Sequence, residues 1–351
     1  MNKILKNHII SENSTVLEAL NKLNLLKQDA IIFVVNNNNH LLGSITDGDI
    51  RRGLIKGIST DSNVLQIIQP NPKFIRELNF DIHNLIEFRD NNYKIIPVIN
   101  NKSQVVNIIN FRFKRSYLPI DIVLMAGGKG SRLMPLTKNT PKPLLKVGSK
   151  PIIEHNIDRL ILFGIENYWI SLNYLADQVK EYFGNGQSKS IKINYVLEDS
   201  PLGTIGAVSK INEFCNDYVL VTNSDILTNL DYEKFFLNFV KEDADFSVVT
   251  IPYEVKIPYA VIENNGNLIT DFKEKPTYRY YSNGGIYLIK KSILKYIPKE
   301  VFYNSTDLME ELIKLNKKVI SYPFSGYWLD IGKHDDYKKA QSDLNNINFG
   351  F

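Results

Sequence analysis

The sequence lacks the features of secreted and membrane proteins. Its 351 residues include one cysteine, Cys215, so no disulfide can form within the chain, and we expect this thiol to be structural. The N-terminal stretch MNKILKNHIISENS has neither the apolar core nor the small-residue cleavage site of a signal peptide. No run approaches the ~18 consecutive apolar residues that a membrane-spanning helix requires. We therefore expect a cytoplasmic protein that does not associate with a membrane.

A large net charge is also missing. The 42 Lys and Arg residues nearly balance 38 Asp and Glu, which leaves a net charge of +4 and a pI near 8.7. Because the basic residues form no tails, small anionic ligands fit this composition better than nucleic acid. The five His residues do not cluster with Ser or Cys, so neither a hydrolase triad nor a His/Cys metal centre is expected.

Acidic residues are absent from one segment, Gly127 to Lys150, which follows the apolar run Ile122 to Ala126. The run is typical of a strand that is covered on both faces. Gly127, Gly128 and Gly130 then permit a turn whose backbone amides can approach an anion. The basic residues of this segment are Lys129, Arg132, Lys138, Lys142, Lys146 and Lys150. Together these features predict a phosphate-binding loop.

Two common phosphate-binding motifs do not fit this loop. A dinucleotide-binding turn opens a helix, but Leu133, Met134 and Pro135 occupy that place, and the P-loop pattern is absent. The residues read instead G-G-x-G-[ST]-R-L-x-P-L-T-x-x-x-P-K-P. This pattern resembles the signature of the sugar-1-phosphate nucleotidyltransferases, also called NDP-sugar pyrophosphorylases. The resemblance covers most of residues 120 to 335.

Strands and helices alternate after the loop, which predicts crossover helices over a mainly parallel sheet. The expected elements are a helix over Pro151 to Phe163, a strand over Tyr168 to Leu172, a helix over Ala176 to Phe183, and strands over Ile191 to Val196 and Tyr218 to Thr222. Ligands bind such sheets at the carboxyl ends of the strands.

The resemblance to the nucleotidyltransferases implies a role for each matching residue. Arg132 would neutralise the leaving pyrophosphate, Lys142 the α-phosphate and Lys275 the attacking sugar phosphate. Glu274 would accept hydrogen bonds from sugar hydroxyls. The remaining positions implied to contact substrate are Ala126, Gly127, Gly128, Gly130, Ser131, Asn173, Gly203, Thr204, Asp225 and Asn283. Gly203 and Thr204 are expected at the start of a helix, with amides directed at the base or the sugar.

A magnesium ion is the implied cofactor. Asp225 follows the apolar strand YVLVT directly, and Asp330 lies in YWLDIG near the end of the chain. From the residues alone, Asp225 could equally cap the next helix. The family resemblance implies that both carboxylates hold Mg²⁺, which accepts few protein ligands and completes its shell with water and phosphate oxygens.

The first hundred residues contain an internal repeat. Ile31 to Thr46 aligns without a gap with Ile95 to Asn110, at a constant offset of 64. Each copy reads as strand, Asn-rich turn and strand, preceded by a helical pattern. With Gly43, Thr46 and Asp49, the first copy resembles a cystathionine-β-synthase (CBS) domain that binds adenine nucleotides.

The second CBS copy departs from this pattern, because Asn107, Asn110 and Phe113 stand at the equivalent positions. At most one nucleotide site is expected, and Thr46 with Asp49 could equally form a turn and a helix cap. A regulatory or dimerising module is the expected role, within a homo-oligomer.

The expected architecture is α/β, with a tandem CBS pair over residues 1–115 and a Rossmann-like nucleotidyltransferase domain with a mainly parallel mixed sheet over residues 120–351. The expected reaction converts an NTP and a sugar 1-phosphate into an NDP-sugar and pyrophosphate. The architecture resembles guanylyltransferases that make GDP-glucosamine for legionaminic acid, so GTP and glucosamine 1-phosphate are the preferred substrates. GDP-mannose, GDP-heptose or UDP-sugar synthesis, or a catalytically silent nucleotide-sensing subunit, are the alternatives.

Overall fold

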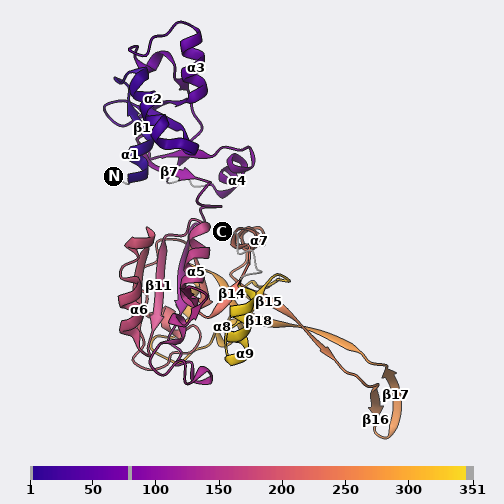
Figure 1. Ribbon diagram of the computed structural model, residues 1–351. Coiled ribbons are helices and arrows are strands. Elements are labelled where there is room, and N and C mark those ends of the chain that lie inside the picture. Colours follow the sequence, from indigo (N-terminus) through magenta and orange to yellow (C-terminus); the bar gives the residue numbers. More distant parts are fainter. Residues whose placement is uncertain (1–2, 78–80, 345–351) are drawn as a thin grey trace. The chain divides into compact units, whose positions relative to one another are not determined.

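The computed structural model describes residues 3–77 and 81–344 (Figure 1). The chain divides into two compact units, Met1–Tyr117 and Leu118–Phe351. The first unit contains helices and two small sheets, and the second contains a larger sheet with its own helices. Within the described residues, no helix combines the length and the apolar character that crossing a membrane would demand.

The first unit consists of two similar halves. Its first sheet has the order β1-β2-β3-β4, and its second has the order β5-β6-β7. The elements of the first half are α1 (Lys3–His8), β1 (Ile9–Ser11), α2 (Val16–Leu26), β2 (Ile31–Val35), β3 (Leu41–Thr46), α3 (Asp47–Ile55) and β4 (Gln69–Pro70). Those of the second half are β5 (Ile75–Arg76), α4 (Ile82–Asp90), β6 (Ile95–Ile99) and β7 (Val105–Asn110).

The repeat recognised in the sequence is present in the strand register. Ile31 pairs with Thr46 in the first hairpin, and Ile95 pairs with Asn110 in the second. Both hairpins also shift register at the equivalent place, after Val34 and after Val98. The two hairpins pack together through a shared apolar cluster that includes Phe33 and Ile95. The unit is therefore built from two copies of one strand–turn–strand element.

The two halves differ where the second hairpin ends. In the first half, Thr46 and Asp49 form a capping box that starts α3. The Asp49 carboxylate accepts hydrogen bonds from Thr46, Arg52 and Gln69 and is buried. In the second half, Phe113 stands where Asp49 would be, and the residues after β7 form a turn instead of a helix. Loss of one acidic residue thus accompanies loss of one helix.

The second unit is organised by a seven-stranded sheet with the order β12-β11-β8-β13-β18-β15-β19. Neighbouring strands are parallel except that β18 runs antiparallel to β13 and β15. This is the mixed, mainly parallel sheet that the sequence predicted. The strands are β8 (Ile120–Met125), β11 (Asn167–Leu172), β12 (Lys192–Leu197), β13 (Tyr218–Asn223), β15 (Phe246–Lys256), β18 (Thr277–Lys290) and β19 (Val319–Pro323).

The helices of this unit form where apolar residues recur at helical spacing. In α5 (Ile152–Leu162), Ile153, Ile157 and Leu160 are fully buried. The other helices are α6 (Ala176–Phe183), α7 (Tyr232–Lys241), α8 (Ser305–Lys314) and α9 (His334–Asp343). These bounds agree with the helices expected over Pro151 to Phe163 and Ala176 to Phe183, within a residue or two. Two short strands, β14 (Ile226–Thr228) and β20 (Trp328–Asp330), pair antiparallel beside the main sheet.

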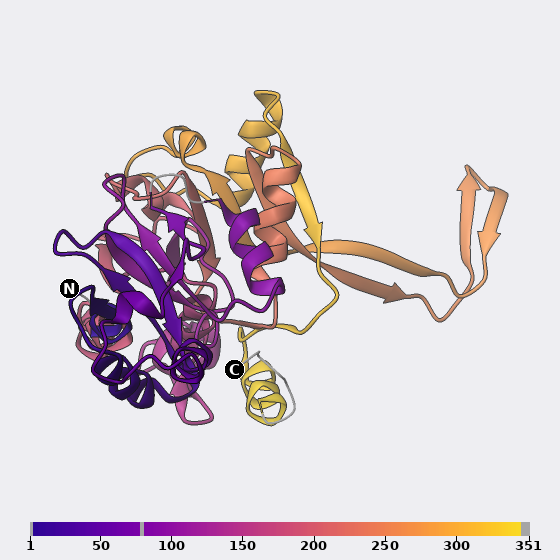
Figure 2. The same ribbon diagram turned by 90° about the horizontal axis from the view of Figure 1, so that it is seen from above.

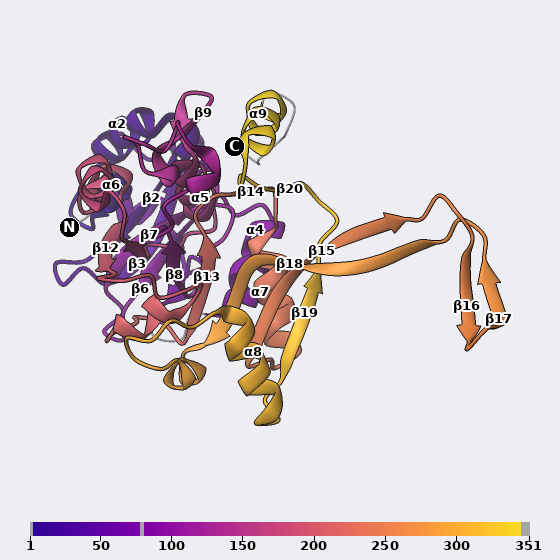
Figure 3. The same ribbon diagram turned by 90° about the horizontal axis from the view of Figure 1, so that it is seen from below.

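An arm projects from the main sheet (Figures 2 and 3). We define the arm as residues 251–282: the outer parts of β15 and β18, with the hairpin β16 (Val261–Asn265) and β17 (Leu268–Lys273) at its tip. Its residues are almost all exposed, whereas the inner parts of β15 and β18 are buried. The chain leaves the sheet along β15 and returns along the adjacent strand β18.

Replacing Asp49 with Ala should destabilise α3 by about 1–3 kcal/mol, because the helix loses its capping box and Thr46 loses its buried acceptor. Hydrogen exchange of residues 47–55 in the full-length chain would measure this. Asp47→Ala is the control, since Asp47 is exposed in the first turn of the same helix, and it should change stability by less than about 0.5 kcal/mol. Equal exchange in both variants would contradict the prediction.

The same carboxylate predicts a pH dependence. Burial alone would raise the pKa of Asp49, but hydrogen bonds from Thr46, Arg52 and Gln69 together lower it below its usual value. The stabilisation is therefore present above the ordinary Asp pKa of about 3.9 and is lost as the pH falls through the lower pKa of the folded state. Asp49→Asn should flatten the change in α3 exchange over this acidic range. An unchanged pH dependence in that variant would assign the effect to another group.

Candidate active site

The glycine turn lies at the carboxyl end of β8. Gly130 has a φ of +64° and precedes one 3-10 turn, Ser131–Leu133. A Cβ at Gly130 would lie 3.0 Å from side-chain carbons of both Lys142 and Thr137, so the turn accommodates only glycine comfortably. The Thr137 hydroxyl donates a hydrogen bond to the carbonyl of Gly130 at 2.9 Å. The loop is therefore held in one shape and brings Lys142 against the turn.

An ion pair joins the loop to a second strand. Lys142 donates to the carboxylate of Asp225, and the two side chains are only 13% and 17% exposed. Asp225 follows β13, the parallel neighbour of β8, so the two strands end side by side. The alternative role of Asp225 as a helix cap is not observed, because β14 follows it and Asp231 caps α7. The carboxylate of Asp225 faces the phosphate-binding loop.

Asp330 is brought to the same place by strand pairing. In the β14–β20 ladder Asp330 lies opposite Ile226, and the amide of Ile331 donates to the carbonyl of Asp225 at 3.1 Å. Burial, followed by the negative charge of Asp225, raises the pKa of Asp330, while Lys142 and Arg132 oppose this rise. The two carboxylates thus repel each other in a partly buried place, a situation that a bound cation relieves.

Arg132 also reaches this end of the site. A Cβ added at Gly332 would lie 3.5 Å from a terminal nitrogen of the Arg132 guanidinium, so the guanidinium packs against the chain two residues after Asp330. Among the described residues, no group of three or more His, Cys, Asp or Glu is placed to hold a metal. Two carboxylates with adjacent cations fit a hard ion that takes its other ligands from water and phosphate oxygens.

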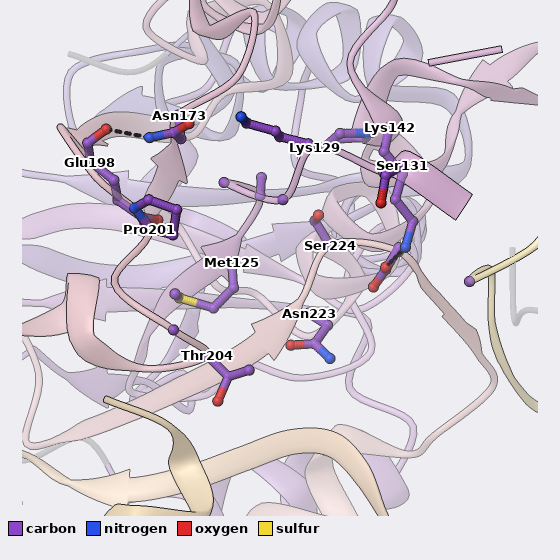
Figure 4. Close-up of a pocket in the computed structure, with 18 of the residues that line it drawn as sticks. Met125, Lys129, Ser131, Lys142, Asn173, Glu198, Pro201, Thr204, Asn223 and Ser224 are labelled. Carbon is purple, nitrogen blue, oxygen red and sulfur yellow. Dashed lines mark hydrogen bonds and ion pairs between the residues drawn. The ribbon is translucent and has the colours of Figure 1, made fainter. Parts of the chain in front are cut away.

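Most of the residues selected from the sequence line one cavity of about 390 Å³. Figure 4 shows Ser131 and Lys142 on one side of it, Asn173, Glu198 and Pro201 on another, and Thr204 with Asn223 below. The lining residues that the sequence predicted are Ala126, Gly127, Gly128, Gly130, Ser131, Arg132, Lys142, Asn173, Gly203, Thr204 and Asp225.

A second cavity of about 270 Å³ adjoins the first, and Thr204 and Asn223 line both. Asn283 and Asp330 line the second cavity. Asn283 accepts hydrogen bonds from the amide of Gly285 at 2.9 Å and from the Tyr287 hydroxyl at 3.0 Å. Asn283 lies within β18, next to the register shift of the β15–β18 ladder and two residues before Gly285, whose φ is +68°. Its side chain is held by residues of the same strand.

Glu274 and Lys275 are not brought to either cavity. Both are exposed and lie on the arm, between β17 and β18. The physical reason is the ladder of β15 and β18, which continues without interruption from Ile251 to Lys256 and carries this segment beyond the sheet. The site within a single chain therefore lacks Lys275, which was expected to hold the sugar phosphate, and Glu274, which was expected to contact the sugar hydroxyls.

The expectation for Gly203 and Thr204 needs a correction. They do not open a regular helix, because a 3-10 helix begins only at Gly206. The amide of Thr204 donates to the Asn304 side chain at 3.3 Å, and the amides of Ile205 and Gly206 donate to the carbonyl of Tyr303. These amides are therefore engaged within the protein. Gly203 and Thr204 nevertheless line the cavity.

Glu198 is a site residue that the sequence reasoning missed. Its buried carboxylate accepts hydrogen bonds from the Ser171 hydroxyl and, at 2.9 Å, from the amide of Leu202. A Cβ at Gly127 would lie 2.6 Å from the same carboxylate. The side chain of Asn173 donates to the Glu198 carbonyl at 2.6 Å. Its position directly after β12, at the carboxyl edge of the sheet, is the signal that could have identified it.

The predicted CBS residues have structural partners. Thr46 and Asp49 form the capping box of α3, which is the alternative that the sequence had left open. Gly43 packs against β4, where a Cβ would lie 2.8 Å from the carbonyl oxygen of Gln69. A nucleotide contact by Gly43, Thr46 or Asp49 stays a prediction.

Protein-family models match both units of this chain. The nucleotidyl transferase family model matches residues 121–347, and the CBS domain model matches residues 2–56. A D-glycero-α-D-manno-heptose 1-phosphate guanylyltransferase of Aneurinibacillus thermoaerophilus is 31% identical, over 64% of this chain and 98% of that protein. A mannose-1-phosphate guanylyltransferase of Mycobacterium tuberculosis is 30% identical, over 64% of each. A UTP–glucose-1-phosphate uridylyltransferase of Synechocystis is 29% identical, over 62% of this chain and 61% of that protein.

The fold has solved relatives as well. A Bacillus anthracis structure described as a glucose-1-phosphate thymidylyltransferase matches with a TM-score of 0.54 and 27% identity, over 66% of this chain and 98% of that one. The region that matches the nucleotidyl transferase family model begins in β8, the strand before the glycine turn, and includes Asp225 and Asp330. A CBS domain precedes this region in the same chain. The chain therefore belongs to the nucleotidyl transferase family.

Proposed function

We propose that this protein transfers a nucleotidyl group from an NTP to a sugar 1-phosphate and releases pyrophosphate. The observation that carries the proposal is the meeting of the glycine turn, the Lys142–Asp225 ion pair and Asp330 at one edge of the sheet. Relatives of this chain whose names specify sugar-1-phosphate guanylyl- and uridylyltransferases support it.

The finer assignment is GTP with glucosamine 1-phosphate, giving GDP-glucosamine for legionaminic acid synthesis. Two guanylyltransferases among the similar proteins favour guanine as the base. The choice of glucosamine rests on the domain architecture. A CBS module joined ahead of such a domain resembles the guanylyltransferases that make GDP-glucosamine. A heptose, mannose or UDP-sugar product is the alternative, in keeping with the names of the other relatives.

The reaction is an in-line displacement at the α-phosphorus. An oxygen of the sugar phosphate forms the new P–O bond, and the bond from the α-phosphorus to the pyrophosphate oxygen breaks. The attacking phosphate is already anionic, so no general base is required. Catalysis then consists of positioning and charge neutralisation. Lys142 would neutralise the α-phosphate and Arg132 the leaving pyrophosphate, from a loop that is held in shape before substrate arrives.

Asp225 and Asp330 would hold the magnesium ion. When bound, Mg²⁺ would offset the negative charge of the phosphate oxygens. Until then Lys142 occupies the carboxylate of Asp225, so this lysine must exchange part of that contact for phosphate. Glu198 would act as a positioning residue, because it fixes the Gly127 turn and the Leu202 loop against each other.

The reaction is tested by incubating the protein with Mg²⁺, each of four NTPs and a panel of sugar 1-phosphates, and by measuring pyrophosphate. Release is expected only when both substrates are present, with GTP preferred. Reactions without a sugar 1-phosphate control for simple NTP hydrolysis. No release with any pair would favour the alternative, a silent nucleotide-sensing subunit.

Arg132→Ala should lower kcat by ~10² to 10³, because a preorganised positive charge at the leaving group is removed. Steady-state pyrophosphate release measures the effect. Lys138→Ala is the matched control: Lys138 lies on the same loop, is exposed and does not line the cavity. Its activity should stay within about twofold of wild type, since surface substitutions rarely have large effects. Equal losses in both variants would point to disturbance of the loop.

Removing divalent ions with a chelator should abolish activity, and added Mg²⁺ should restore it. Asp330→Asn should require a higher Mg²⁺ concentration for half-maximal rate, by ~10-fold or more, because one of two carboxylate ligands is lost. Titration of the rate with Mg²⁺ measures this. Asp335→Asn, at an exposed position on the first turn of α9, is the control. An Mg²⁺ dependence unaltered in Asp330→Asn would remove Asp330 from the metal site.

Regulation by an adenine nucleotide at Gly43, Thr46 and Asp49 is a separate proposal. Calorimetry with AMP and ATP on the full-length protein tests it, with Thr46→Ala as the variant expected to lose binding. Because the nucleotidyl transferase site can also bind ATP, heat that persists in Thr46→Ala would assign binding to that site. Absence of heat with both ligands would leave the CBS module a structural role.

A further inference from the structure

The arm has one apolar face and one mainly charged face, which also carries Pro252 and Tyr281. In its ladder Tyr253 lies opposite Tyr280, and Val255 lies opposite Tyr278. Residues that are directly opposite or two apart share a face of a ribbon, so these four side chains lie together. The other face carries Glu254, Lys256 and Arg279, and the Arg279–Glu254 ion pair at 2.6 Å crosses it. An amphipathic ribbon of this kind is built to cover another surface.

Among residues 3–77 and 81–344, none covers the apolar face enough to bury it. Tyr253, Val255 and Tyr280 are all exposed. At the tip, Ile262 lies opposite Phe272, and Phe272 is 65% exposed. A two-stranded ribbon with both faces in water is only marginally stable, and exposed apolar side chains gathered on one face of it indicate a contact with another molecule.

The arm also carries Glu274, which the family resemblance assigns to the sugar hydroxyls, and Lys275, which it assigns to the sugar phosphate. Neither residue lines the cavities of the chain's own site. The cavity beside Asn283 and Asp330, where the sugar phosphate would lie, has no Lys or Arg among its described lining residues. A sugar phosphate carries negative charge and needs a cation close to it. The site of one chain is therefore incomplete on its sugar side.

The ladder argues against the arm folding back onto its own site. Paired residues run from Ile251 and Ser282 to Lys256 and Thr277, and the register shift of these strands lies at the base, between Val248 and Thr250. The amide of Ile257 continues the pairing by donating to Pro276 at 3.1 Å. Bending the arm back would break these hydrogen bonds, whereas the straight ribbon spans roughly 20 Å over six residues.

We propose that two copies of this chain exchange arms, so that Glu274 and Lys275 of one copy complete the sugar-phosphate side of the site in the other. The inference rests on the proposed function, because the exchanged residues would contact the sugar 1-phosphate that the proposed reaction uses. Exchange between identical chains is reciprocal, so one symmetric contact completes two sites. The apolar face of each arm is then covered by the other copy.

Mixed dimers test the exchange. Each of two variants, Lys275→Ala and Asp225→Asn, should have a kcat lowered by ~10² to 10³ when it is expressed alone. The two chains are co-expressed with different tags, and the mixed dimer is purified through both tags in turn. With exchanged arms, the Lys275→Ala chain receives an intact arm from its partner, so one of two sites works. Activity should then be about half that of wild type. With unexchanged arms, both sites stay inactive.

A reciprocal pair makes each result decisive. A chain carrying both Lys275→Ala and Asp225→Asn is paired with a wild-type chain. Exchanged arms leave this pair inactive, because the wild-type site receives the altered arm, whereas unexchanged arms leave it about half active. Half activity here, or full activity of Lys275→Ala alone, would overturn the exchange. Failure of the proposed function is distinguishable, because wild type itself would then release no pyrophosphate.

The apolar face provides a second test. Tyr253→Ser combined with Tyr280→Ser should raise KM for the sugar 1-phosphate ~10-fold or more and leave KM for the NTP nearly unchanged, because the arm loses its seat on the other copy. Tyr281→Ser is the matched control: Tyr280 and Tyr281 are both 57% exposed, but Tyr281 lies on the opposite face. Equal effects of the two changes, or none, would contradict the assigned contact face.

Discussion

The ion pair between Lys142 and Asp225 is the contact on which the site depends. It joins the phosphate-binding loop to the end of β13, and it does so in a partly buried place where an unpaired charge would be costly. Around it, Gly130 sets the turn, and the β14–β20 ladder places Asp330. Removal of either partner would therefore leave the other charge partly buried and unpaired and would release the loop from the end of β13.

Much of the fold followed from local patterns. The apolar run before Gly127, the helix over Ile152–Leu162 and the repeat at an offset of 64 all occur as the sequence predicted, because each depends on residues close together in the chain. The positions of the candidate site residues on the loop and at strand ends were predictable for a different reason: the carboxyl edge of a parallel sheet gathers strand ends that are distant in the chain.

What could not be predicted depends on contacts between distant segments. The amide of Thr204 is engaged by Asn304, one hundred residues later, so a loop that resembles an open helix start is closed. Glu198 belongs to the site because Ser171 and Leu202 converge on it. The placement of Lys275 depends on how far the β15–β18 ladder continues, and a strand pattern does not state where its partner strand ends.

The arm leaves and re-enters the sheet through two adjacent strands. Its two ends are therefore held at a fixed distance whatever lies between them, and chain inserted at such a place costs little stability. Residues can be added to or removed from it in the course of evolution without moving Asp225, Lys142 or Asp330. The length and sequence of the arm can thus vary while the edge of the sheet that carries Lys142, Asp225 and Asp330 keeps its geometry.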